Sequence, residues 1–198
     1  MTDAISPAVR RVSMARPRRR AVLAALACAA LLPQLSARAQ GMALENQVKA
    51  AYLYKFASFT EWPAGTFARP DSPLLIAVAG NDAVARELEQ IVAARTVAGH
   101  PVQVRRLKPG DSPAGVHMLY IGALERAAAA ALLAQARSLP VLTVSDADDG
   151  LALGAMINFL IDQERLRFDV ALRQVALGRL RISARMLAAA HKVEGEAT

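Results

Sequence analysis

Cysteine is nearly absent from this chain: Cys28 is the only one among 198 residues. Aromatic residues are also scarce, at 5% of the chain, and Trp62 is the single tryptophan. One cysteine cannot form an internal disulfide, and Cys28 lies in a segment that we expect to be removed from the mature protein. Thiol catalysis, a cysteine-based zinc site and a cysteine redox switch are therefore excluded. The expected mature length, about 159 residues, buries enough surface to fold without disulfides.

Histidine is scarce too, and the common catalytic motifs are missing. His100, His117 and His191 are spread over the chain. No HExxH, GxSxG or P-loop motif occurs, and each of these chemistries needs its side chains at a fixed spacing. We therefore expect no catalytic residue, no cofactor and no metal site.

Three aspartates, Asp146, Asp148 and Asp149, follow an apolar run. Carboxylate oxygens suit Ca²⁺ or Mg²⁺, but the spacing lacks the DxDxDG pattern and a distal glutamate, so we expect a solvated turn. The segment Gly80-Asn81-Asp82 has one glycine only. It indicates a helix cap rather than a phosphate-binding loop.

The net charge of +7 is concentrated at the beginning of the chain. Residues 1–39 hold seven arginines and one acidic residue, which leaves 17 basic and 16 acidic residues in the rest. An arginine-rich stretch precedes the apolar run Ala21–Leu32, and Ala37-Arg38-Ala39 follows it. This order is typical of a secretory signal peptide, which we expect to be cleaved after Ala39. Sec and twin-arginine export both stay open, and an uncleaved anchor is the alternative.

Without the leader, the chain is close to neutral. Phosphate contacts need a clustered basic surface. The remaining clusters, Arg105-Arg106-Lys108 and Arg179-Arg181-Arg185, are typical of solvated faces. Nucleic-acid binding is therefore not expected.

Apolar periodicity predicts a single α/β domain over residues 40–198. Continuous apolar runs suit strands buried on both faces, and spacings of three and four suit helices. The expected strands are 74–79, 101–107, 117–121, 141–144, 156–161 and 166–170, and the expected helices are 45–59, 82–94, 124–137, 171–177 and 184–193. Their alternation predicts a three-layer α/β/α sandwich whose mostly parallel sheet has five or six strands, with an antiparallel hairpin at the edge.

The segment Glu61-Trp62-Pro63 ends the first predicted helix, because the residue before a proline is disfavoured in a helix. Exposed aromatic residues are favoured at protein interfaces. A lone tryptophan near Phe56 and Phe59 can equally close the core. Both roles of Trp62 stay open at this point.

Five ordered blocks of the sequence resemble the YfiR-like family of periplasmic proteins. They are Val48–Phe56 with Phe59 and Glu61-Trp62-Pro63, His117–Gly122, Pro140–Asp146, Gly154–Phe159 with Leu166–Val170, and Leu180–Leu187. The resemblance spans roughly residues 45–193, which is nearly the whole predicted mature chain.

The resemblance implies a non-enzymatic periplasmic repressor. The best-understood members bind the periplasmic sensor domain of an inner-membrane diguanylate cyclase and keep it inactive. An outer-membrane lipoprotein can sequester them, which raises cyclic di-GMP and favours biofilm formation. We expect the same class of partners here, with a homodimer left open. The predicted partner contacts are Glu61, Trp62, Asn158 and Phe159, and a buried hydrogen bond is the alternative role of Asn158.

The sequence departs from the family in two respects. The best-known members carry disulfides, whereas this mature chain would have none, and Lys55 and Ala171 stand where asparagine is common. The alternative function is a periplasmic small-ligand-binding protein. Its pocket would lie at the strand ends near Gly80, Gly122 and Asp146, where α/β sheets bind ligands.

Overall fold

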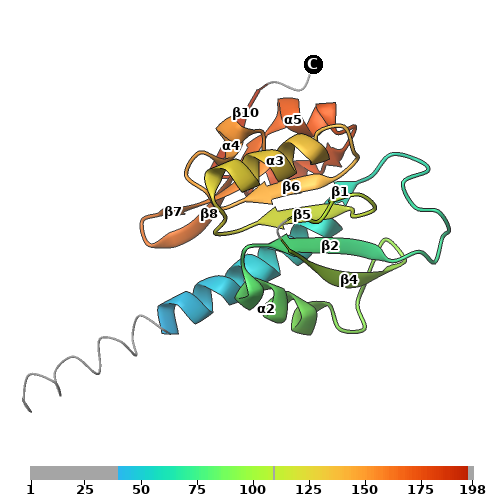
Figure 1. Ribbon diagram of the computed structural model, residues 1–198, viewed down its shortest axis with the longest axis horizontal. Coiled ribbons are helices and arrows are strands. Elements are labelled where there is room, and N and C mark those ends of the chain that lie inside the picture. The colour runs from blue at the N-terminus through green and yellow to red at the C-terminus, as the bar shows by residue number, and fades with distance from the viewer. Residues whose placement is uncertain (1–39, 109, 196–198) are drawn as a thin grey trace, which may run out of the picture. The chain divides into compact units, whose positions relative to one another are not determined.

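The computed structural model describes residues 40–108 and 110–195. The predicted signal peptide, residues 1–39, lies outside these ranges, so its cleavage stays a prediction. The residues from Met42 onward form one compact unit. Figure 1 shows this unit as a sheet with helices on both faces.

The main sheet has eight strands in the order β10-β8-β7-β6-β5-β2-β4-β3. In chain order these are β2 (Leu74–Ala79), β3 (Thr96–Val97), β4 (His100–Leu107), β5 (Met118–Ile121), β6 (Leu142–Ser145), β7 (Ile157–Asp162), β8 (Arg165–Ala171) and β10 (Lys192–Glu194). Parallel pairing joins β4, β2, β5, β6 and β7, whereas β3–β4 and β7–β8 are antiparallel. The predicted fold class, a mostly parallel α/β sandwich, is confirmed.

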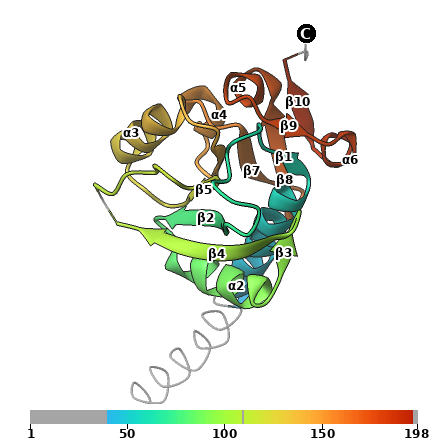
Figure 2. The same cartoon turned by 90° about the vertical axis from the view of Figure 1, so that its right-hand side faces the viewer.

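Helices cover the two faces of the main sheet (Figures 1 and 2). The N-terminal helix (residues 40–58) and α2 (Asp82–Val92) pack on one face, while α3 (Arg126–Ala136) and the segment after α4 (Gly150–Leu153) pack on the other. Two further helices, α5 (Leu172–Leu177) and α6 (Ala184–Leu187), follow β8. None of the helices in the described part of the chain has the length and apolar character that a membrane span requires.

The central strand β2 shows why the sheet needs both helical layers. Ile76 and Val78 belong to the core under the N-terminal helix, whereas Ala77 and Ala79 belong to the core under α3. Successive side chains of a strand point to opposite faces, so a continuous apolar run must be covered twice. The two alanines of this strand, Ala77 and Ala79, both lie on the face of the sheet that α3 covers.

Local signals place the helix and hairpin boundaries. The side chain of Asn81 accepts a hydrogen bond from the backbone N–H of Val84 at 3.0 Å, which caps α2 as predicted. Between β7 and β8, Gln163 and Glu164 both have positive φ, at 48° and 60°. Two successive residues with positive φ are typical of the tight turn that joins two twisted strands.

Short strands at the periphery are the main difference from the sequence-based prediction. The last predicted helix, 184–193, ends at Leu187, and Lys192–Glu194 forms β10 instead. The alanines at 188–190 favour a helix locally, but Val193 pairs with Val170 of β8, so tertiary pairing overrides the local preference. The β7–β8 hairpin is therefore not the outermost part of the sheet.

A second, two-stranded sheet was also not predicted. β1 (Thr60–Glu61) pairs antiparallel with β9 (Arg181–Ile182), and Glu61 lies opposite Arg181. The N-terminal helix thus ends at residue 58, before Trp62-Pro63, because the chain enters this strand.

Four aromatic rings attach the N-terminal helix to the β7–β8 hairpin. The Phe56 ring lies 4.8 Å from that of Phe168 and 5.6 Å from that of Phe159, between centroids. Tyr52 adds edge contacts to Phe168 at 5.6 Å. Phe56, Phe159 and Phe168 are almost completely buried, so this cluster contributes both buried area and favourable ring geometry.

We predict that Phe56→Ala destabilises the protein by about 3–5 kcal/mol, the usual cost of truncating a buried phenylalanine. The measurement is urea unfolding followed by circular dichroism. Lys55→Ala, the exposed neighbour on the same helix, should change the unfolding free energy by less than about 0.5 kcal/mol. Equal effects of the two substitutions would contradict this description of the core.

Candidate functional site

The four predicted partner contacts lie at opposite ends of the sheet. The indole N–H of Trp62 donates to the carbonyl oxygen of His117, just before β5, at 3.1 Å. Asn158 pairs with Ser145, the last residue of β6. Because β5 and β6 are parallel, Trp62 is at the edge where the strands begin and Asn158 at the edge where they end. The structure does not bring the two pairs of residues together.

Their exposure differs as well. Glu61 is exposed and Trp62 is partly buried, whereas Asn158 is 8% and Phe159 3% exposed. The Asn158 amide N–H donates to the carbonyl of Phe159 at 3.1 Å. Its side-chain oxygen has no hydrogen-bond partner among the described residues and lies against Gly150, where an added Cβ would collide with it. Glu61 and Trp62 are thus the two that a partner can reach without rearrangement.

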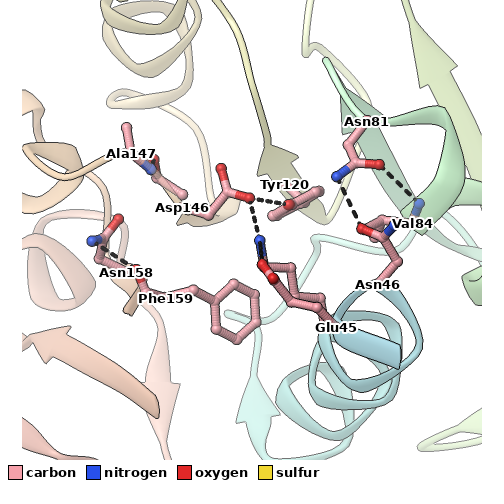
Figure 3. Close-up of polar contacts among 11 residues, drawn as sticks. Glu45, Asn46, Asn81, Val84, Tyr120, Asp146, Ala147, Asn158 and Phe159 are labelled. Atoms are coloured by element: carbon pink, nitrogen blue, oxygen red, sulfur yellow. Dashed lines mark hydrogen bonds and ion pairs between the residues drawn. The ribbon is translucent and has the colours of Figure 1, made fainter. Parts of the chain in front are cut away.

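A buried ion pair joins the N-terminal helix to the carboxyl end of the sheet (Figure 3). The Lys49 ammonium lies 2.7 Å from a carboxylate oxygen of Asp146 and 2.7 Å from one of Glu45. The same Asp146 oxygen accepts a hydrogen bond from the phenol of Tyr120 at 2.6 Å. Lys49 is 7% exposed and Tyr120 is fully buried, whereas the Glu45 side chain is 40% exposed. The four groups form one polar network, open to solvent at Glu45, which we call the Lys49 network.

The protonation states of the Lys49 network follow from its contacts. Burial alone would lower the pKa of Lys49, but the hydrogen bonds and charges of Asp146 and Glu45 outweigh it and raise the pKa. Burial, followed by the negative charge of Asp146, raises the pKa of Tyr120 far above its usual range. Lys49 therefore stays charged and Tyr120 stays a hydrogen-bond donor at physiological pH.

Two asparagines form a second polar contact, between the N-terminal helix and the start of α2. Asn81, which caps α2, donates from its side chain to that of Asn46 on the N-terminal helix at 3.3 Å. Figure 3 shows this pair next to the Lys49 network. The N-terminal helix is thus attached to the carboxyl end of the sheet by two sets of polar contacts.

A cavity of about 340 Å³ adjoins the Lys49 network. Carboxylate, ammonium and amide groups form one side of it, and apolar hairpin residues form the other. Its lining includes Glu45, Lys49, Asp146, Asn158, Ile161 and Leu166. A cavity of this size and mixed lining suits a small polar metabolite.

The predicted strand-end pocket is not one cavity. Asp146 lines the 340 Å³ cavity, Gly80 lines a separate one of about 740 Å³, and Gly122 lines neither. An added Cβ at Gly80 would lie 2.7 Å from Leu124, so this glycine permits close packing. The three residues do not surround a common ligand site.

The aspartates that follow β6 have separate contacts. Asp146 belongs to the Lys49 network, and Asp149 pairs with Arg126 at 2.6 Å. Within residues 40–108 and 110–195, no group of three or more His, Cys, Asp or Glu side chains is arranged to hold a metal ion.

The opposite edge of the sheet carries an aromatic cluster that we call the His–Phe–His stack. Phe67 lies between His100 and His117, with ring centroids 3.7 Å and 4.4 Å away and planes within 11° and 9° of parallel. The Trp62 ring meets Phe67 edge-on at 6.3 Å. Trp62 therefore packs on the stack, and part of the Trp62 side chain stays accessible to solvent.

Three residues of these sites, Lys49, Tyr120 and His117, were not predicted as site residues from the sequence. One signal was available: Lys49, Leu53 and Phe56 have the i, i+4, i+7 spacing of a single helix face, which places a charge within an apolar stripe. Glu45 and Lys49 also have the i, i+4 spacing of a helical ion pair. Asp146 and the partners of His117 lie far along the chain, and no local pattern identifies them.

We predict that Asp146→Asn lowers the unfolding free energy by about 2–3 kcal/mol, because hydrogen bonds to charged groups contribute roughly 1.5–3 kcal/mol. Lys49→Met combined with Asp146→Asn should cost less than the two single effects added together, since it removes both buried charges and the remaining carboxylate, Glu45, is 40% exposed to water. Denaturant unfolding of the three variants measures both quantities. The control is Asp148→Asn, an exposed neighbour, and additive effects would exclude a coupled network.

Comparison with known families adds an independent finding. A family model described as YfiR/HmsC-like matches residues 46–191, which include every strand of the sheet except β10. The match confirms the resemblance seen in the sequence blocks. No curated protein matches the chain.

Proposed function

Because the chain belongs to the YfiR/HmsC-like family, we propose that it is a non-enzymatic periplasmic regulator of cyclic di-GMP signalling. It binds the periplasmic sensor domain of an inner-membrane diguanylate cyclase and holds the cyclase inactive. An outer-membrane lipoprotein is the competing partner that releases the cyclase. The family match over residues 46–191 is the observation that carries this proposal.

Repression requires a difference in affinity. A binding protein shifts a receptor between two states only by binding one state more tightly than the other. A shift from 1:99 to 99:1 needs a preference of about 10⁴-fold. The regulator itself therefore needs a well-ordered contact surface and no catalytic chemistry.

The β1–β9 sheet offers such a surface. Glu61 and Arg181 lie opposite each other on it, both are exposed, and Trp62 follows directly. Tryptophan and arginine are enriched in protein interfaces, and an exposed charge such as Glu61 contributes to the selection of a partner of complementary charge. We define Glu61, Trp62 and Arg181 as the β1–β9 surface and propose it as the contact with the sensor domain.

We predict that Glu61→Arg weakens sensor-domain binding about tenfold, equivalent to about 1.4 kcal/mol. The substitution places two like charges opposite each other on β1 and β9, so it should also lower the unfolding free energy slightly, by about 1 kcal/mol or less. Glu125→Arg, an equally exposed charge reversal beyond the carboxyl end of β5, is the matched control. Surface plasmon resonance with the purified sensor domain measures both, and equal affinities would reject the β1–β9 surface as the contact.

The receptor can be identified by a pull-down from membranes with tagged protein exported to the periplasm, followed by mass spectrometry. Recovery of a diguanylate cyclase with a periplasmic domain supports the proposal. Recovery of other receptors keeps a binding role but rejects the link to cyclic di-GMP. The same experiment detects a lipoprotein partner.

The 340 Å³ cavity supports a second candidate function, the binding of a small periplasmic ligand. It is lined by Asn158, whose side-chain oxygen lacks a partner among the described residues, and by the charged groups of the Lys49 network. A true ligand should raise the melting temperature progressively with its concentration. A thermal-shift screen of small polar metabolites tests this, and an unchanged melting temperature across the screen would count against it.

A further inference from the structure

His117 forms hydrogen bonds with three other segments of the chain. Its backbone N–H donates to the carbonyl of Leu75, and its ring Nδ1 accepts from the N–H of the same residue, at 2.9 and 3.0 Å. Its carbonyl accepts from Leu142 at 2.9 Å and from the indole of Trp62 at 3.1 Å. One histidine thus joins the starts of β2, β5 and β6 to the segment that carries Trp62.

The loop over residues 62–73 is fixed by both histidines of the stack. It leads into β2, which lies between β5 and β4 in the sheet. His117 precedes β5 and His100 begins β4, so their rings stand on either side of Phe67 in the loop. The Nδ1 of His100 lies 2.8 Å from the carbonyl oxygen of Ser72, which only a protonated nitrogen can approach as a donor.

Protonation of His117 is incompatible with this arrangement. Its Nδ1 accepts from the Leu75 N–H and must therefore carry no proton. The imidazolium would place a second N–H against that of Leu75, which removes the bond and sets two donors face to face. A charge on both His117 and His100 would also place two cations on either side of the Phe67 ring.

We propose that the His–Phe–His stack is an acid-sensitive latch, which holds loop 62–73 closed at neutral pH and releases it on mild acidification. This loop begins at Trp62 of the β1–β9 surface. The latch would therefore couple pH in the surrounding compartment to partner binding, and this second step rests on the proposed function.

Few charged groups near the His–Phe–His stack would stabilise a protonated His117 in the closed loop. On the loop, Arg69 and Asp71 are exposed and pair with each other at 3.0 Å. On β1, Glu61 is exposed. From β4, His100 is the titratable group that acts on His117, and its charge disfavours a charge there.

The direction of the pH dependence follows from His117. Burial, followed by the nearby His100, lowers its pKa below the ordinary value of 6.5, although a hydrogen bond to the backbone of Thr66 opposes this. His117 then binds a proton more readily when the loop is released or the protein is unfolded than when the loop is closed. The closed loop is therefore most stable above about pH 6.5 and loses stability as the pH falls through the lower, folded-state pKa.

Amide hydrogen exchange by NMR tests the latch in the purified protein. Between pH 7.5 and pH 5.0, the protection factor of the Leu75 amide should fall about tenfold, the order of effect expected when one hydrogen bond is lost. Amides of α3 should keep their protection over the same range. An unchanged Leu75 protection factor in the wild-type protein would overturn the latch without recourse to any variant.

Two substitutions assign the effect to the stack. His117→Gln replaces the ring with a neutral acceptor and should abolish the pH dependence at Leu75. His191→Gln removes the remaining histidine, which pairs with Asp169 far from the loop, and should leave it intact. Loss of the pH dependence in His191→Gln, or its persistence in a folded His117→Gln, would overturn the assignment.

Measuring sensor-domain binding at pH 7.5 and at pH 5.0 tests the latch and the proposed function separately. Weaker binding at pH 5.0 in the wild type, but not in His117→Gln, supports the coupling. If the loop is released at pH 5.0 but the affinity for the sensor domain is unchanged, the coupling is rejected and the latch itself is still supported. Absence of binding at both pH values rejects the proposed function, and hydrogen exchange still decides the latch.

Discussion

The packing of the N-terminal helix against one face of the sheet is the interaction on which the rest of the molecule depends. Phe56 and Tyr52 fill the space above the β7–β8 hairpin, and the same helix covers the apolar residues of β2 and β5. The second helix on this face, α2, covers only part of it. Without the N-terminal helix, the apolar residues that it covers would therefore face water, and burial of such surface is the dominant stabilising term in folding. Its position also fixes where the chain enters β1, and hence where the β1–β9 surface lies.

Two polar anchors complement this apolar contact at opposite ends of the strands. The Lys49 network fixes the helix at the carboxyl end, and His117 fixes the chain that follows the helix at the other end. The two anchors respond to pH in different ranges, because the pKa of Lys49 is raised and that of His117 is lowered. Near neutral pH the ammonium–carboxylate contact is constant, so only the histidine end is sensitive to mild acid.

The sequence predicted much of the fold and little of the site, for physical reasons. Runs such as Leu74–Ala79 and caps such as Asn81 encode their structure locally, and the structure bears both out. The segment near Val193 favours a helix by itself and forms a strand only because β8 offers an unpaired edge. Asp146 is 97 residues from Lys49, and Leu75 is 42 residues from His117. Such pairs depend on the order of strands in the sheet, which periodicity does not specify.

The outermost strand β10 has a consequence for the behaviour of the protein at high concentration. It covers the open edge of β8 beside Phe168 and Val170, and it is only three residues long, with Lys192 and Glu194 on either side of Val193. Short, charged edge strands are poor templates for further strand addition. A chain lacking this segment would leave the backbone of β8 unpaired at Asp169–Ala171, and we expect it to be more prone to self-association through this edge. β10 thus covers a backbone edge although none of its three residues is buried.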